Sequence, residues 1–171
     1  MHRLTPLVAL LLTAQVLAAC VAQGARPLPQ GAFRAKDAPI YSSAVLDPAR
    51  LVGRWKQVAG FGPPGACKPG GVEISRGAGG LRAVWRLCLG GQEARGSAPM
   101  QPAGPGRFDV AGQTWWVLWA DGDYRTLAIG TPDGGFGFVL DRSGGISGDR
   151  LRAAREILAW NGYDLNRFVS Y

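Results

Sequence analysis

A glycine followed two positions later by a tryptophan opens the segment that most constrains this fold. From Gly53 to Phe61 the side chains alternate between two faces. A period of two residues predicts a strand with one face turned toward a core. A glycine beside an indole indicates a close backbone approach where that ring is buried. The face that we expect to point inward holds Trp55, Gln57, Ala59 and Phe61.

Seven more short strands and one helix are predicted after this segment. Turns rich in glycine and proline separate them, which accounts for the 26 glycines and 12 prolines. We expect strands at 53–61, 72–75, 81–89, 93–100, 107–110, 114–120, 124–130 and 136–141. Ser147 is expected to cap an amphipathic helix that stops at Asn161 and Gly162, before a last short strand at 168–171.

Consecutive short strands with tight turns favour an antiparallel meander. Closing such a meander removes its edges, and eight strands leave an interior that can hold one small ligand. The fold class we predict is therefore all-β with one flanking helix. It is an eight-stranded antiparallel up-and-down β-barrel plus a C-terminal α-helix.

The first residues are expected to be a leader rather than part of the fold. An apolar run from Leu7 to Leu17 is too short for a comfortable membrane span, and it ends in small residues before Cys20. This junction resembles the lipobox of bacterial lipoproteins, which implies cleavage before Cys20 and lipid attachment to it. The alternatives are an ordinary signal peptide with a stray cysteine, or a short anchor. Val21 in place of aspartate favours the outer membrane, with the protein facing the periplasm.

Three segments follow from this interpretation. Residues 1–19 are the signal peptide, residues 20–45 are a lipid-anchored tether and N-terminal arm, and residues 46–171 are the barrel with its helix. Export would place Cys67 and Cys88 in an oxidising compartment, where they can pair as a disulfide; two buried free thiols are the alternative.

Charge and composition argue against several function classes. The net charge of +7 comes mostly from scattered single arginines, so no basic cluster indicates nucleic acid as a partner. The single histidine, His2, lies in the leader, and without histidine the domain lacks the common nucleophilic triads and most zinc sites. We therefore predict no enzyme, no cofactor and no metal.

Three motifs in order resemble those of the lipocalin family. They are Gly53-x-Trp55, Asp121-Gly122-Asp123-Tyr124-Arg125 after an aromatic strand, and Phe138-Val139-Leu140-Asp141-Arg142 before a helix. The resemblance covers residues 46–171 and implies a bacterial outer-membrane lipocalin. Counting strands up and down places Gly53, Trp55, Asp121, Tyr124 and Arg142 at one closed end, where the family lays the arginine across the tryptophan ring. The same counting places Cys67 and Cys88 together at the other end. The stretch from Gln92 to Thr114 is short for the family, which predicts a shallow cup.

The resemblance implies binding of a small hydrophobic ligand, such as a fatty acid or lysophospholipid, for lipid storage, transport or envelope maintenance. The alternatives are a structural or interaction lipoprotein whose filled barrel binds an envelope protein, and, more weakly, a lipocalin-type enzyme acting on a lipid. The residues we expect to line the ligand are Gln57, Phe61, Trp85, Trp115, Val117, Trp119, Phe136, Phe138 and Leu140.

Overall fold

Strands are the dominant secondary structure of residues 32–171, the part of the chain that this computed structural model describes. The strands are β1 (Gly53–Phe61), β2 (Gly71–Gly77), β3 (Gly80–Leu89), β4 (Gln92–Gly104), β5 (Arg107–Val110), β6 (Gln113–Ala120), β7 (Thr126–Gly130), β8 (Gly137–Asp141) and β9 (Phe168–Ser170). The helices are η1 (Pro48–Leu51), α1 (Gly148–Trp160) and η2 (Leu165–Arg167), where η marks a 3-10 helix.

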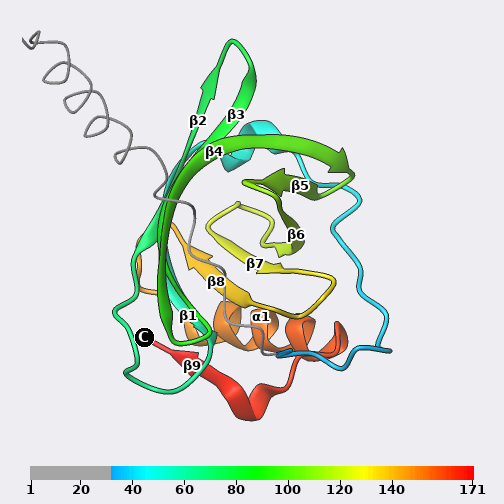
Figure 1. Cartoon of the computed structure of the whole chain (residues 1–171), viewed down its shortest axis with the longest axis vertical. Helices are drawn as coiled ribbons and strands as arrows, with labels where there is room; N and C mark the ends of the chain where they lie inside the picture. Colours follow the sequence, from blue (N-terminus) through cyan, green and yellow to red (C-terminus); the bar gives the residue numbers. More distant parts are fainter. Residues whose placement is uncertain (1–31) are drawn as a thin grey trace, which may run out of the picture.

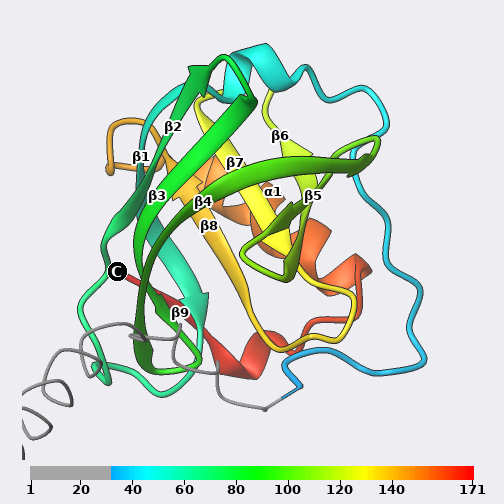
Figure 2. The same cartoon turned by 45° about the horizontal axis from the view of Figure 1, so that its top comes forward.

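The first eight strands close into an antiparallel barrel, as predicted (Figures 1 and 2). Each strand pairs with the next one along the chain, and β1 pairs with both β2 and β8. The short β9 continues the sheet against the second half of β1. Closure gives the backbone of β1 to β8 a partner on both sides over much of its length, which removes exposed edges.

The helix α1 packs on the outside of the barrel, against β6 and β7. It begins at the predicted cap, where the Ser147 side chain accepts a hydrogen bond from the Arg150 backbone, and it ends at Asn161. Its buried residues, Ala154 and Leu158, face the barrel wall. The prediction of one flanking amphipathic helix is thus confirmed.

Two hydrophobic clusters lie on opposite sides of the barrel wall. The inner cluster fills the interior and consists of Leu51, Trp55, Val72, Ile74, Leu81, Ala83, Leu87, Leu89, Ala98, Met100, Phe108, Val110, Trp115, Val117, Leu127, Ile129, Phe136, Phe138 and Leu140. The outer cluster lies between the wall, α1 and the N-terminal arm, and consists of Phe33, Val58, Ala59, Phe61, Leu118, Ala128, Val139, Ala154, Leu158 and Tyr163.

Two β-bulges make part of the predicted inward face wrong. One shifts the register of β1 between Gln57 and Ala59, and the other shifts β6 between Val117 and Trp119. A bulge adds one residue to a strand, so every side chain beyond it moves to the other face. Phe61 therefore lies in the outer cluster, and Trp119 packs against it.

Strand lengths also differ from the prediction around β4 and β5. The predicted strand from 93 to 100 continues through Pro102 to Gly104, which makes β4 the longest strand of the described chain. Pro99 fits because β5 pairs with β4 only from Met100 onward, and proline is best tolerated where a strand has one neighbour. The shortness lies in β5 alone, which has 4 residues.

The segment from residue 32 to 47, which we call the N-terminal arm, runs along the outside of the barrel. Phe33 donates to Gly134 in the β7–β8 loop, Ser43 donates to Val117 in β6, and the backbone N–H of Asp47 donates to the Tyr124 hydroxyl. The arm thereby covers the part of β6 that the short β5 leaves unpaired. Residues 1–31, including the predicted leader and Cys20, lie outside the described residues. No helix within 32–171 is long and apolar enough to span a membrane.

Cys67 and Cys88 form a disulfide that joins the β1–β2 loop to β3. Leu87 and Leu89 belong to the inner cluster, so the Cys88 side chain between them points to the outer face of the wall. The bond therefore holds the β1–β2 loop on the outside of β3 rather than across the interior.

Candidate functional site

One end of the barrel is built around Trp55 and Arg142. The guanidinium carbon of Arg142 lies 3.6 Å from the centre of the Trp55 ring. Its nitrogens donate to the carbonyls of Val52 at 2.9 Å and Arg50 at 2.7 Å, and burial lowers the pKa of the guanidinium. Gly53 is required here, because its φ is +118° and an added Cβ would lie 2.5 Å from an Arg142 nitrogen. We call this the motif end and the opposite end the loop end.

The β6–β7 turn completes the motif end. Asp121 accepts backbone hydrogen bonds from Arg125 at 2.6 Å and Thr126 at 2.5 Å, which fixes the turn. Tyr124 has a φ of +55°, so it belongs to the turn rather than to the strand predicted from 124 to 130. Its ring lies 4.1 Å below the guanidinium of Arg50, which comes from η1. The turn and η1 are thus held together across the barrel end.

Asp141 connects the last barrel strand to α1. Its side chain is 1% exposed and lies 3.4 Å from the Arg150 guanidinium. Burial alone would raise the pKa of the Asp141 carboxyl, but hydrogen bonds from Ser143 and Thr126 and the charge of Arg150 outweigh it and hold the pKa below its ordinary value. The carboxylate is therefore a structural anion, with its oxygens already occupied.

Four aromatic side chains meet in the interior, and we call them the aromatic cluster: Trp85, Trp115, Phe136 and Phe138. The ring of Trp115 lies 5.7 Å from that of Trp85 and 5.4 Å from that of Phe138, in edge-to-face arrangements. Trp85 comes from β3, and the other rings come from β6, β8 and the residue just before β8. The cluster therefore bridges strands that are distant around the barrel wall.

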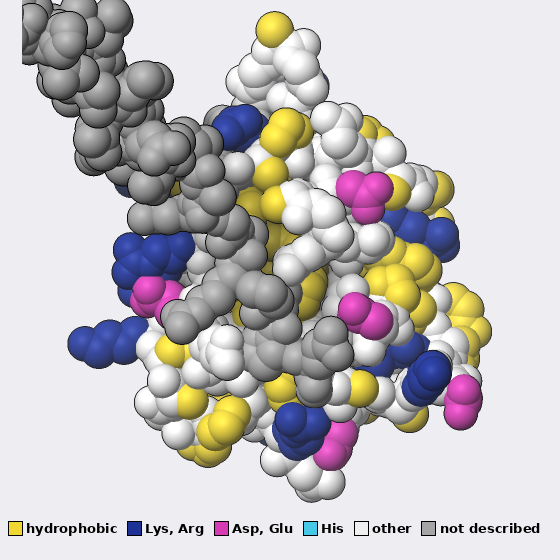
Figure 3. Space-filling view, viewed as in Figure 1, with side chains coloured by type: hydrophobic (Ala, Val, Ile, Leu, Met, Phe, Trp, Pro, Cys, Tyr) yellow, Lys and Arg dark blue, Asp and Glu magenta, His cyan; other side chains and the backbone are white. Residues whose placement is uncertain are grey.

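An apolar pocket of about 330 Å³ lies at the motif end. Three of its lining residues, Leu81, Met100 and Phe108, belong to the inner cluster. Leu46 and Pro48 close it from the arm and η1, while Arg76 and the tips of the β2–β3 and β4–β5 hairpins form the remaining wall. Figure 2 shows η1 beside the β2–β3 tip, and Figure 3 shows hydrophobic side chains in several patches on the visible face, one of them near its centre. We call this the motif-end pocket.

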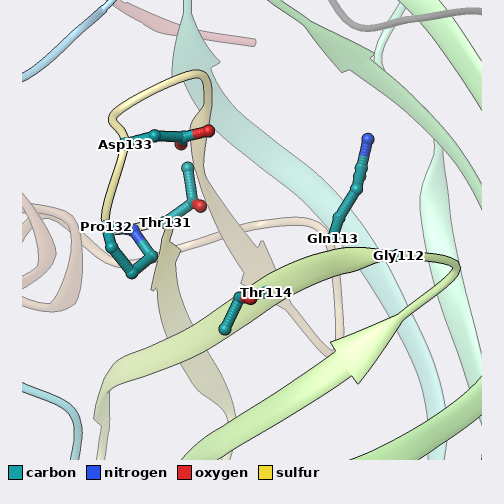
Figure 4. Close-up of a pocket in the computed structure, with 6 residues that line it drawn as sticks. All are labelled: Gly112, Gln113, Thr114, Thr131, Pro132 and Asp133. Atoms are coloured by element: carbon teal, nitrogen blue, oxygen red, sulfur yellow. The ribbon is translucent and has the colours of Figure 1, made fainter.

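A second, more polar cavity of about 250 Å³ lies at the loop end. Its lining comes from the start of β6 (Gln113 and Thr114, after Gly112) and from the β7–β8 loop (Thr131, Pro132 and Asp133). Figure 4 shows the two segments on opposite sides of the cavity. The two described cavities therefore differ in chemistry, since apolar walls line the first and hydroxyl, amide and carboxylate groups line the second.

Comparison with known proteins agrees with this geometry. Residues 102–171 match the family model described as a lipocalin-like domain. Similar solved structures include the allergen Per a 4 from cockroaches, with 12% identity over 80% of this chain and 94% of that chain and a TM-score of 0.58. Lobster apocrustacyanin A1 has 16% identity, coverage of 83% and 92%, and a TM-score of 0.52. Insecticyanin from the tobacco hornworm Manduca sexta has 16% identity, coverage of 78% and 84%, and a TM-score of 0.58. The whole barrel therefore has the lipocalin fold, and residues 102–171 match the lipocalin-like domain. No curated protein matches it.

The barrel brings together most of the residues that we predicted for a ligand site. Those that lie in the inner cluster or pack against it are Trp85, Trp115, Val117, Phe136, Phe138 and Leu140. Phe61 and Trp119 lie on the outer side instead, because of the two bulges. Whether any of these residues contacts a ligand stays a prediction.

Gln57 has a different environment from the one we expected. Its amide oxygen accepts from the Cys88 N–H and its amide nitrogen donates to the Cys88 carbonyl, both at 2.8 Å. The strand β2 lies between β1 and β3 only as far as the pair of Lys56 with Gly71. Past this pair, the Gln57 amide takes the place of β2 by bonding to the Cys88 backbone in β3. Its hydrogen bonds are thus used within the lipocalin wall, and it has less capacity to orient a ligand.

The residues of the motif-end pocket were not predicted. Met100 and Phe108 lie in segments that looked short and weakly patterned, and Leu46 looked like the start of the domain. The alternation on β3 offered one signal, because it placed Leu81 on the inward face of the lipocalin barrel. Within residues 32–171 no group of three or more histidine, cysteine or acidic side chains is placed to hold a metal ion.

Proposed function

We propose that this protein binds one small, mostly aliphatic ligand in the barrel interior, and that the ligand enters through the motif-end pocket. The observation that carries the proposal is that residues of the inner cluster line an apolar cavity open to the outside. Small-molecule pockets are typically about 300–1,000 Å³ and largely apolar, so a cavity of about 330 Å³ favours a small ligand with one chain. A fatty acid or a lysophospholipid chain fits this description better than a diacyl lipid does.

We further propose that the protein is anchored by lipid at Cys20 to the outer membrane, facing the periplasm, and serves lipid storage, transport or envelope maintenance. The support is the lipobox-like sequence before Cys20. Residues 20–31 can reach about 40 Å when extended, enough to let the barrel approach a bilayer surface. Labelled palmitate should attach to the full-length chain and fail to attach to Cys20→Ala, and an unlabelled wild-type chain would refute the anchor.

Binding can be tested with a pair of adjacent substitutions on the arm. Leu46 lines the pocket, whereas Val45 is 91% exposed. The mature chain from Cys20, made as Cys20→Ser to prevent acylation, is titrated with the neutral fluorophore N-phenyl-1-naphthylamine and then with dodecanoic acid or lysophosphatidylcholine as competitors. We expect saturable binding that Leu46→Trp abolishes and Val45→Trp preserves.

The same titration distinguishes ligand binding from the competing structural function. A structural lipoprotein with a filled barrel would bind none of these ligands, while its unfolding transition would stay cooperative. Equal binding by both tryptophan variants would place the ligand outside the motif-end pocket and would refute the proposed entry.

A further inference from the structure

A buried indole N–H without a hydrogen-bond partner lies in the barrel interior. Trp115 is 2% exposed and belongs to the inner cluster, yet its Nε1 has no partner. Buried donors in folded proteins are nearly always paired, because an unpaired one loses its bond to water without a replacement. Within residues 32–171 the other buried side-chain donors without a partner are Trp116 Nε1 and Arg150 Nη1. Both lie outside the barrel, since Trp116 packs against the outer cluster and Arg150 pairs with Asp141.

The surroundings of Trp115 make a water molecule a poor partner. A buried water is held by about two to four hydrogen bonds to polar groups. The rings around Trp115 are those of Trp85, Phe136 and Phe138, at 5.7, 6.4 and 5.4 Å between ring centres. A water at the indole N–H would have one good partner among mostly aromatic walls.

Phe108 connects the motif-end pocket to Trp115, which does not itself line the pocket. Phe108 lines the pocket, and it is the cross-strand partner of Trp115 in the β5–β6 pair. Side chains that face each other in this way have Cβ atoms about 5 Å apart. A ligand that passes Phe108 therefore reaches the Trp115 ring.

The acceptor that can reach the indole is restricted in charge. Every residue of the inner cluster is apolar. Arg142 at the motif end already donates to the carbonyls of Val52, Arg50 and Tyr124. Arg76 lines the pocket with an exposed side chain and can pair with a carboxylate that stays at that wall. An ionised carboxylate carried past Phe108 to the indole would lose its hydration and leave Arg76 behind, which is costly. A carbonyl, ester or ether oxygen loses far less.

We propose that Trp115 determines ligand specificity by donating its indole N–H to a neutral oxygen of the ligand, whose aliphatic chain lies in the motif-end pocket. This inference rests on the proposed binding function. It goes beyond that function by naming the acceptor at the indole: a ketone, aldehyde, ester or ether oxygen is preferred there over an ionised carboxylate, and a plain alkane offers no acceptor.

Indole NMR signals test the contact directly. The six tryptophans each give one indole ¹H–¹⁵N signal, and the Trp115 signal is the one that disappears in Trp115→Phe. On the mature Cys20→Ser chain, undecan-2-one should move the indole proton signal of Trp115 downfield. Undecane, which has no acceptor, should not cause this downfield shift. The methyl signal of Met100, which lines the pocket, reports occupancy by either ligand.

Affinities provide the second readout. Displacement of N-phenyl-1-naphthylamine should show undecan-2-one binding about fivefold more tightly than undecane, the effect of one net hydrogen bond. Trp115→Phe should remove the preference for the ketone and keep the undecane affinity, while Trp116→Phe, the matched control, should change neither.

The outcomes separate this inference from the binding function on which it rests. If undecane binds and perturbs Met100 but the ketone gains nothing, or if Trp115→Phe keeps the ketone preference, the role of Trp115 is refuted and the binding function stands. A downfield shift of the Trp115 signal with decanoate at pH 8 as large as that with the ketone would also refute the neutral acceptor. If neither ligand displaces the probe nor perturbs Met100, both proposals fail.

Discussion

Trp55 and Trp115 are equally buried, at 2% exposure each, but their indole N–H groups are satisfied differently. Trp55 donates to the Leu51 carbonyl at 2.8 Å, and Arg142 covers its ring. Trp115 is packed among other rings, and its N–H has no partner within the described chain. Two equally buried tryptophans thus differ in whether the indole donor is already used. This difference is the basis for proposing a ligand contact for Trp115 and a structural role for Trp55.

Removing Trp55 should give the largest loss of stability. Trp55→Ala deletes the ring under Arg142 and the hydrogen bond to Leu51, and such core truncations cost about 3–5 kcal/mol. Urea unfolding measures the change, with Trp160→Ala as control because that side chain is 74% exposed. We expect the control to cost under about 0.5 kcal/mol. A Trp55→Ala cost similar to that of the control would mean that the motif end does not hold the barrel closed.

Loss of the disulfide should come next. The cysteines are separated by 21 residues, and a bridge of this span stabilises by about 3 kcal/mol in the chain-entropy model. Because the bridge lies on the outer side of the wall, the Cys67→Ala/Cys88→Ala variant should keep its affinity for N-phenyl-1-naphthylamine. A large loss of affinity in a variant that still unfolds cooperatively would show that the loop end shapes the binding site.

The Asp141 carboxylate predicts a pH dependence at the motif end. Its folded pKa is below the unfolded value, so its contribution is full above about pH 4 and is lost as the pH falls through the folded pKa. Asp141→Asn should cost about 2 kcal/mol at pH 7, and the gap from wild type should shrink below about pH 4. Urea unfolding from pH 7 to pH 3 measures it. A gap that is constant with pH would argue that geometry rather than charge is responsible.

Trp115→Phe should have the smallest effect on stability. It removes an unpaired donor and leaves a slightly smaller ring in place, so the loss of unfolding free energy should stay below about 1.5 kcal/mol. Thermal and urea unfolding of this variant beside Trp55→Phe compare one substitution in two environments. Equal losses at the two positions would mean that the satisfied N–H of Trp55 adds nothing to stability.

Much of the fold could be predicted because its determinants are local. Alternating side chains and glycine-rich turns marked the strands, and Ser147 and Asn161 marked the helix ends. The residues of the motif end could be predicted because they belong to the three motifs that resemble those of the lipocalin family. The two bulges could not be predicted, because Val117-Leu118-Trp119 is apolar throughout and both faces of that part of β6 are covered by apolar residues. The end of β1, Val58-Ala59-Gly60-Phe61, likewise carries no polar side chain. Either register satisfies such sequences, so Phe61 and Trp119 were assigned to the wrong side.

The motif-end pocket arises from a difference in length between neighbouring strands, which cannot be read from any one segment of the sequence. It exists because β4 is long, β5 is short, and the arm covers only part of the difference. Leu46, Met100 and Phe108 come together there from three segments, none of which shows a binding pattern by itself. The sequence also could not predict that the Trp115 N–H lacks a hydrogen-bond partner, because this depends on which side chains surround the indole in the folded protein.

Met100 offers the most direct measurement of the central claim, that the interior receives a ligand through the motif-end pocket. It is the only methionine besides Met1, and it lines that pocket. In a chain labelled with ¹³C-methyl methionine, a titration with undecan-2-one should move the Met100 signal saturably, and Leu46→Trp should abolish the shift while Val45→Trp keeps it. A Met100 signal that stays fixed up to the solubility limit of the ligand would contradict the account.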